Sequence, residues 1–184
     1  MNRRQSLGIM GTVAATLAFA GAARATTARA VSLSELVRRS TRIARATALD
    51  SFARMEDIGG TRHVVTYSRV RIDDAIHGPS GDSETLVRTL GGRVGDVGEI
   101  VHGEAELALN ETSLVFLTAD SNGVELVTAM AQGHYPVAID QAGVPRLQIS
   151  RNMPHLLGGS VSAAAQLSGK PFTEARALIL GAGH

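Results

Sequence analysis

The sequence of 184 residues contains no cysteine and no tryptophan, and aromatic residues make up only 3% of it. Without cysteine, the chain has no disulfide, no thiolate metal ligand and no lipid attachment site behind an export signal. The scarcity of aromatic side chains excludes a stacking platform for single-stranded nucleic acid. Hydrophobic residues still make up 44% of the chain, so a core can form without a disulfide or a structural metal.

A surplus of charge of either sign is also missing. The formal net charge is +1, but Arg3, Arg4, Arg24 and Arg29 lie in the first 30 residues, where there is no Asp or Glu. Without these four arginines, the rest of the chain carries a charge of −3. A mildly acidic domain has no electrostatic reason to bind DNA, RNA or anionic lipid headgroups, so we expect no nucleic-acid partner.

The first 30 residues have the three-part pattern of a cleaved signal peptide. Residues 1–4 are positively charged, Leu7 to Ala23 is apolar but rich in Ala and Gly, and small-x-small sites end at Ala25 and Ala30. We predict a signal peptide over residues 1–30, with cleavage after Ala30 or, as second choice, after Ala25. No later apolar stretch approaches the length of about 20 residues that spans a membrane. The mature form is therefore expected to have no membrane span and to be periplasmic or secreted.

The start of this segment is similar to the twin-arginine export motif. It reads Asn2-Arg3-Arg4-Gln5-Ser6-Leu7. Ser6 stands where Phe is usual, whereas Leu7 occupies the expected apolar place. The alternative is an ordinary secretory signal with two chance arginines, and both alternatives lead to export.

Most of the remaining chain alternates with a period of two, which is typical of β-strands. Between His63 and Ile76, Val64, Thr66, Ser68 and Val70 share one face, and the residues between them share the other. Leu114 to Leu117 is apolar throughout, which predicts a strand buried on both faces. The other predicted extended stretches are 43–54, 84–90, 99–102, 105–108, 124–130, 134–139 and 146–149.

Local signals set the ends of these elements. Ser32 and Glu35 have the spacing of a capping box, which predicts a short helix to about Arg39. Asp120-Ser121-Asn122-Gly123 predicts a tight hairpin turn, since Asn-Gly readily adopts positive φ angles. The glycine-rich segment 91–98 predicts a bulge or a strand crossing. Thr173 is expected to cap a short helix near the C-terminus.

These elements predict an all-β fold. We expect a small OB-like antiparallel barrel over residues 31–150, with a short helix at each end of the mature chain. Residues 151–184 form a tail whose helix packs on the same domain. No internal repeat and no linker divides the mature chain.

Several landmarks, taken in order, resemble a family of exported bacterial β-rich proteins without assigned activity. They are Leu33 to Ser40, Val65-Thr66-Tyr67, Val70-Arg71-Ile72, Ile76-His77-Gly78, Leu90-Gly91-Gly92, Leu114 to Leu117, and Ala131 to Val137. The layout is also similar in shape to the OB-type barrel of netrin-like modules and tissue inhibitors of metalloproteinases. The resemblance implies a link to matrixin-like metalloproteases, which accompany some members. Those inhibitors act through an N-terminal cysteine, which this chain lacks, so their mechanism does not transfer.

Residues with recognisable chemistry are few. His102, Glu104 and Glu106 form the densest group and would share one face if the segment were a strand, which makes them weak candidates for a metal site. A solvated strand face or loop is the simpler interpretation. No serine stands in the G-x-S-x-G pattern of a nucleophile, and the glycine-rich segment lacks the order of a phosphate loop.

His134 and Tyr135 are the candidates for a partner contact. They are two polar rings side by side, followed by Pro136, which implies an edge strand. The competing interpretation is that Tyr135 closes one end of the barrel.

The sequence favours an exported, non-catalytic binding or accessory module with an unknown protein partner and no cofactor. One alternative is an inhibitor or partner of an exported metalloprotease. The other is a small metal-dependent hydrolase that uses His102, Glu104 and Glu106.

Overall fold

The computed structural model describes residues 27–79, 83–158 and 162–183. The predicted export segment lies outside the described residues as far as residue 26. The strands are β1 (Thr27–Arg29), β2 (Arg42–Ile58), β3 (Thr61–His77), β4 (Glu84–Leu90), β5 (Gly92–Val94), β6 (Val97–Glu99), β7 (Thr112–Ala119), β8 (Glu125–Val127), β9 (His134–Ile139), β10 (Pro145–Leu147) and β11 (His155–Leu157). The helices are α1 (Leu33–Arg39), the 3₁₀ helix η1 (Met130–Gly133), α2 (Ala163–Leu167) and α3 (Phe172–Ala182).

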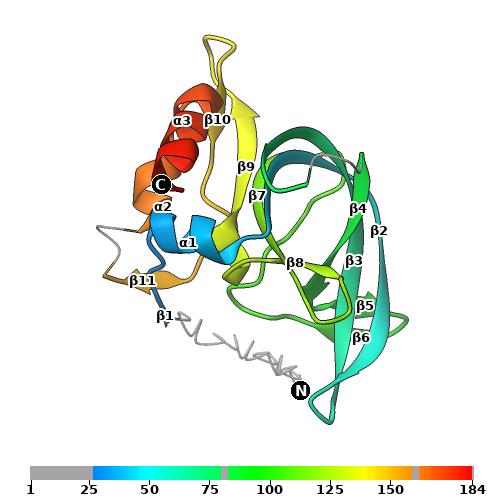
Figure 1. Cartoon of the computed structure of the whole chain (residues 1–184). Helices are drawn as coiled ribbons and strands as arrows, with labels where there is room; N and C mark the ends of the chain where they lie inside the picture. The colour runs from blue at the N-terminus through cyan, green and yellow to red at the C-terminus, as the bar shows by residue number, and fades with distance from the viewer. Residues whose placement is uncertain (1–26, 80–82, 159–161, 184) are drawn as a thin grey trace, which may run out of the picture.

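The main sheet has seven strands in the order β10-β9-β7-β2-β3-β4-β8. β8 pairs in parallel with β4 and antiparallel with β7, so the pairing returns from the last strand to β7. We call β7, β2, β3, β4 and β8 the strand ring. Figure 1 shows this ring on one side of the molecule, with β9, β10 and the helices on the other. The expectation of a mostly β fold with few helices is confirmed.

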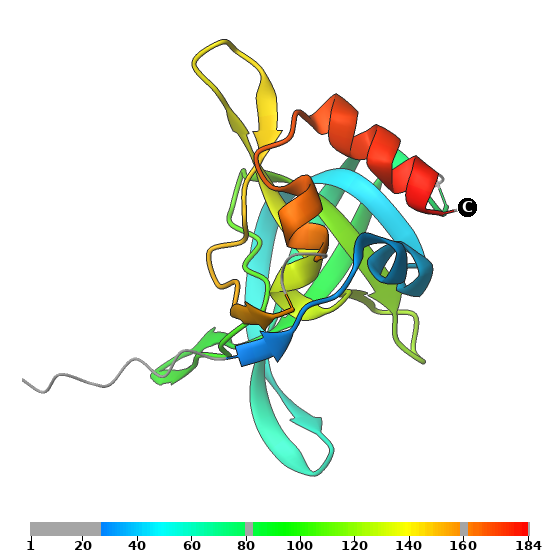
Figure 2. The same ribbon diagram turned by 90° about the vertical axis from the view of Figure 1, so that its left-hand side faces the viewer.

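The hairpin of β2 and β3 is the longest element, with 17 residues in each strand. Its register shifts between Ile43 and Ala44, between Arg45 and Ala46, and between Ala48 and Asp50. Such bulges bend a strand, and they lie in the first part of β2, which pairs with β7 along its other edge. The far end of the hairpin projects beyond the rest of the molecule (Figure 2).

The local signals at α1 and at the main hairpin turn are confirmed. The Ser32 hydroxyl accepts a hydrogen bond from the Glu35 backbone N–H at 3.2 Å and caps α1. The Gly123 backbone N–H donates to the Asp120 carbonyl at 3.0 Å, and this turn joins β7 to β8. β7 is buried on both faces from Ser113 to Leu117, as its apolar run predicts.

Other expectations are wrong in detail. Residues 100–111 form no strand, and the glycine-rich segment folds into the small hairpin of β5 and β6. Pro136 is not on an edge strand, because β9 lies between β10 and β7. The last helix begins after Pro171 and not at Thr173, and Pro suits a helix start because it has no N–H to satisfy.

Two separate clusters of buried side chains form the core. The helix-side core joins α1, α2 and α3 to β7 and β9, and its large members include Leu36, Leu114, Phe116, Tyr135 and Ile179. The ring core lies among the strands of the ring and consists of Ala46, Ala48, Val70, Val87, Ala105, Val115, Leu117 and Val127. No helix of the described residues is long and apolar enough to cross a membrane.

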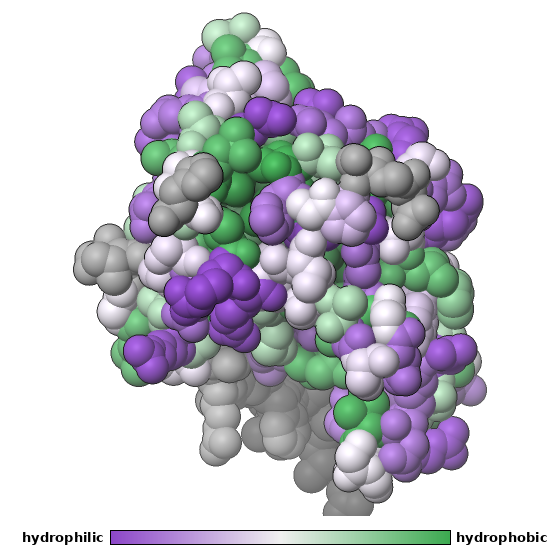
Figure 3. All heavy atoms as spheres, viewed as in Figure 1, coloured by the Kyte–Doolittle hydropathy of each residue, from purple (hydrophilic) through white to green (hydrophobic). Residues whose placement is uncertain are grey.

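Hydrophobic and hydrophilic residues are unevenly spread over the surface. In the view of Figure 1, hydrophobic residues gather toward the upper left, around β9, β10 and the helices (Figure 3). Hydrophilic residues dominate the right-hand side, where β2 and β3 lie, with isolated hydrophobic residues among them. This side of the strand ring has no broad apolar surface in this view, so we expect a partner to bind there through a few specific side chains.

Candidate functional site

The most distinctive surface of the strand ring is its outer face on β2, β3 and β4. We define this outer face by Phe52, Arg54 and Glu56 of β2, Tyr67 and Arg69 of β3, and Leu86 and Arg88 of β4. Phe52, Tyr67 and Arg88 are direct neighbours in the register, so their side chains lie on the same side of the sheet. Phe52 is 50% exposed, whereas Tyr67 is only 6% exposed.

The Tyr67 ring is held by contacts along β2. Phe52 stacks on it, with ring centroids 5.4 Å apart and planes 10° apart. The Arg54 guanidinium lies 4.6 Å from the centroid of the same ring, which is within cation–π range. The Tyr67 hydroxyl donates to Glu56 at 2.6 Å and accepts from Arg54 at 3.1 Å. Phe52 is therefore an exposed aromatic side chain on a fixed support.

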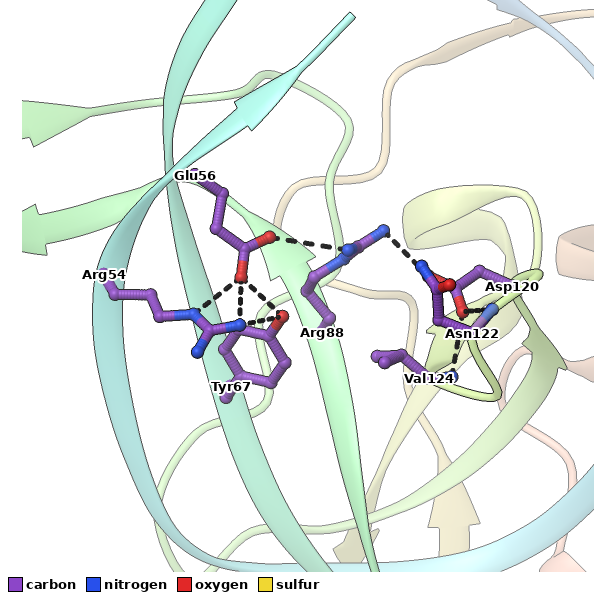
Figure 4. A network of polar contacts seen from close by, with 7 residues as sticks. All are labelled: Arg54, Glu56, Tyr67, Arg88, Asp120, Asn122 and Val124. Carbon is purple, nitrogen blue, oxygen red and sulfur yellow. Dashed lines mark hydrogen bonds and ion pairs between the residues drawn. The ribbon is translucent and has the colours of Figure 1, made fainter.

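Arg88 connects this surface to the turn between β7 and β8 (Figure 4). Its guanidinium lies 3.5 Å from the Glu56 carboxylate and 3.4 Å from the Asp120 carboxylate. Asp120 also accepts the backbone N–H groups of Asn122 and Val124, at 2.8 and 2.9 Å. The turn is thereby tied to the outer face through the ion pair of Arg88 with Asp120.

The contacts of the network stabilise the ionised form of its two carboxylates. The Tyr67 hydroxyl, followed by the Arg54 guanidinium, holds the pKa of Glu56 below its usual range. The Val124 backbone N–H lowers the pKa of Asp120 in the same way. Both carboxylates are ionised at neutral pH and already paired, so neither is suited to take up a proton from a substrate.

His134 and Tyr135, the predicted partner contacts, are 1% and 0% exposed. The His134 ring lies between the hydroxyls of Ser113 and Ser150, at 3.0 and 3.1 Å. Burial lowers the pKa of His134 to about 4, and it raises the pKa of Tyr135. Tyr135 packs edge-on against Phe116 with centroids 6.1 Å apart. A partner contact through these two residues stays a prediction, and it would require this part of the core to open.

The predicted trio His102, Glu104 and Glu106 does not share a face, because its segment is not a strand. His102 and Glu106 are exposed, whereas Glu104 is buried. Within residues 27–79, 83–158 and 162–183, no group of three or more His, Asp or Glu side chains is arranged to hold a metal ion. The idea of a hydrolase that uses this trio therefore loses its geometric basis.

Glu104 instead lies at an open cavity of about 670 Å³, which is lined by the inward-facing residues Thr66 and Ser68 of β3 and Thr89 of β4 and reaches the exposed residues Ile100 and Leu109. Its carboxylate accepts the backbone N–H of Ala105 at 2.9 Å and that of Leu90 at 3.3 Å. Burial raises the pKa of Glu104 in spite of these two donors. The wall also requires glycine at Gly92, whose φ is +128°, because a Cβ there would lie 2.3 Å from the Thr66 hydroxyl oxygen.

The sequence reasoning missed the outer face. A signal for it exists, because Phe52, Arg54 and Glu56 alternate along one strand and therefore share a face. The alternation along β2 does not identify the neighbouring strands. Tyr67 and Arg88 lie beside Phe52 because of the register of β2, β3 and β4.

No protein-family model and no curated protein matches the chain. The resemblance to exported β-rich proteins therefore stays a prediction. The geometry of the described residues has to carry the functional argument.

Proposed function

We propose that the protein is an exported, non-catalytic binding module that holds a protein partner on the outer face. The observation that carries this proposal is Phe52, a half-exposed aromatic side chain fixed by its stack on Tyr67. Aromatic and arginine side chains contribute most of the energy at protein interfaces, and a fixed side chain loses less entropy when it binds.

The distribution of aromatic residues supports this choice of surface. Among the described residues, Phe116, Phe172, Tyr67 and Tyr135 are buried, and Phe52 is the exposed aromatic side chain. Leu86 is 43% exposed on the neighbouring part of the outer face. We infer a partner with an apolar pocket for Phe52 and polar groups at its rim for the guanidinium of Arg54.

We further propose that the strand ring is an OB-like barrel. The support is the pairing of β2 with β3, β3 with β4, β4 with β8, and β8 with β7, which returns to β2. OB folds bind ligands on the face of their second and third strands and on the loop between the last two strands. By this analogy, β3, β4 and the turn at Asp120 fall where such folds bind, although a shared fold does not by itself imply a shared function.

Export is the remaining part of the proposal. β1 pairs with β11, and the Gln132 side chain bonds the Arg29 carbonyl at 3.0 Å and the Val31 N–H at 2.9 Å. Cleavage after Ala30 would remove β1, so we favour cleavage after Ala25. N-terminal sequencing of the exported form distinguishes the two sites. A block of export when Arg3 and Arg4 are replaced by Lys would support the twin-arginine route.

The binding proposal is tested by site-specific photo-crosslinking in cells. A benzophenone amino acid replaces Leu86 on the outer face, and in a matched control it replaces Ile139, which is 67% exposed on β9. We expect one discrete crosslinked protein from position 86 and none from position 139. Phe52→Ala should abolish the crosslink while changing the free energy of unfolding by only about 1 kcal/mol. A crosslink that survives Phe52→Ala, or one that forms equally from position 139, would refute the proposal.

A further inference from the structure

Consecutive residues of β3 serve two different surfaces. Tyr67 belongs to the outer face, whereas Thr66 and Ser68 on either side of it line the cavity inside the ring. We call this space, of about 670 Å³, the inner cavity. Its volume is in the range of sites that bind small organic molecules. Its walls come from β2, β3, β4 and the segment from Glu99 to Leu109.

Two residues whose hydroxyl groups have no protein partner among the described residues line the inner cavity. Ser68 is 2% exposed and Thr89 is 7% exposed. Neither hydroxyl forms a hydrogen bond with another group in the described part of the chain, whereas the Thr66 hydroxyl donates to the Gly91 carbonyl at 2.7 Å. Neither oxygen is among the buried atoms without a partner, so both hydroxyls keep accessible surface at the cavity and are open to hydrogen bonds from a ligand.

The titratable side chains among the described residues that line the inner cavity are all acidic, and Glu104 has no cationic partner among them. Glu104 is 8% exposed and accepts only backbone N–H groups. Among the described residues that line the cavity there is no Lys, Arg or His. Of the other lining carboxylates, Glu99 is paired with His63 at 2.7 Å and Glu106 is exposed. A buried carboxylate without a cation is costly, and a cationic ligand would remove that cost.

The rest of the lining selects an organic cation over a metal ion. The described carboxylates do not converge as metal ligands do. The lining includes the apolar residues Val101 and Leu107, and also Ile100 and Leu109, which are 85% and 63% exposed. A ligand with one charged end and an apolar body would satisfy both kinds of wall.

We propose that the inner cavity binds a small organic amine, whose ammonium group pairs with the Glu104 carboxylate and donates to the hydroxyls of Ser68 and Thr89. The apolar body of the amine packs against Val101 and Leu107. This site is on the opposite side of β3 from the outer face, so it does not depend on the partner proposed there.

The experiment uses the mature chain and simple probes. Titration calorimetry and NMR shift changes are measured with n-butylamine, cyclohexylamine and 1,4-diaminobutane, and with n-butanol and cyclohexanol as neutral controls. We expect at least one amine to bind with a Kd of about 1 mM or tighter, as small fragments do. The matching alcohol should bind at least about tenfold more weakly, because it lacks the charge-assisted hydrogen bond. Amines that fail to bind, or alcohols that bind equally well, would overturn the proposal.

Variants locate the site. Glu104→Gln should weaken amine binding by about tenfold or more, whereas the matched Glu174→Gln, on α3 outside the cavity, should leave it unchanged. If Glu104→Gln fails to fold, the double variant Ser68→Ala and Thr89→Val keeps the carboxylate and should weaken binding several-fold. Unchanged affinity in the folded Glu104→Gln or double variant would place the amine elsewhere and refute the inference.

Discussion

The helix-side core and the ring core differ in what fills them. The helix-side core contains the largest fully buried side chains, such as Tyr135, Phe116 and Leu36. The ring core is built from Ala, Val and Leu, and it adjoins a cavity with a buried carboxylate and free hydroxyls. β7 belongs to both, since Leu114 and Phe116 face one side and Val115 and Leu117 face the other. The helix side thus supplies close packing, and the ring leaves room for a ligand.

Tyr135→Ala should give the largest effect, because it empties the helix-side core. We expect a loss of about 3–5 kcal/mol in the free energy of unfolding, as for other large-to-small core changes. Urea denaturation at neutral pH measures it. Tyr135→Phe is the matched control: the Tyr135 hydroxyl is buried without a hydrogen-bond partner among the described residues. Its removal should leave stability unchanged or raise it by up to about 1 kcal/mol.

If Tyr135→Ala left the free energy of unfolding nearly unchanged, the comparison between the two cores would fail. The same result combined with loss of a partner would restore Tyr135 as a contact residue.

His134 should make the helix side sensitive to acid. Burial, followed by the nearby charge of Arg151, lowers its pKa in the folded state to about 4 from 6.5. The unfolded state therefore binds the proton more tightly, and the stabilisation is complete above pH 6.5 and is lost as the pH falls through 4. The shift corresponds to about 3 kcal/mol.

The measurement is the free energy of unfolding from neutral pH down to pH 4, compared between the wild type and His134→Gln. Subtracting the two curves removes the carboxylates that both proteins share. The difference should shrink as the pH falls, because only the wild type must exclude a proton from this position. Parallel curves would mean that His134 titrates normally and that its site is open to water.

The sequence predicted what depends on neighbours along the chain. The Ser32 cap, the Asn122-Gly123 turn and the two-sided burial of Leu114 to Leu117 all follow from local patterns. The closing pair of β4 and β8 could not be predicted, because it joins short segments far apart in the sequence and leaves no periodic signal. α2 (Ala163–Leu167) was also not predicted, because its five residues are too few to show a helical period.

The candidate sites show the same difference between features set by neighbours along the chain and features set by long-range strand pairing. Glu104 was singled out by its spacing from His102 and Glu106, but the segment is not a strand, and the hydroxyls that line the same cavity as Glu104 come from β3 and β4. Phe52 and Glu56 were visible as alternate residues, yet their contact with Tyr67 depends on strand register. Local pattern finds polar residues, and only long-range pairing shows which of them meet.

The smallest effect is expected inside the ring, from Thr89→Val. The Thr89 hydroxyl lines the inner cavity and has no partner among the described residues. Its replacement should change the free energy of unfolding by no more than about 1 kcal/mol, in the stabilising direction, while weakening amine binding.

Val87→Thr is the reverse change two residues earlier on β4, at a fully buried position of the ring core. That change should cost about 1–3 kcal/mol, because it buries a hydroxyl among apolar side chains. Urea denaturation of both variants decides the matter: if Thr89→Val is as destabilising as Val87→Thr, the Thr89 hydroxyl is a structural group, and the ring interior is not prepared for a ligand.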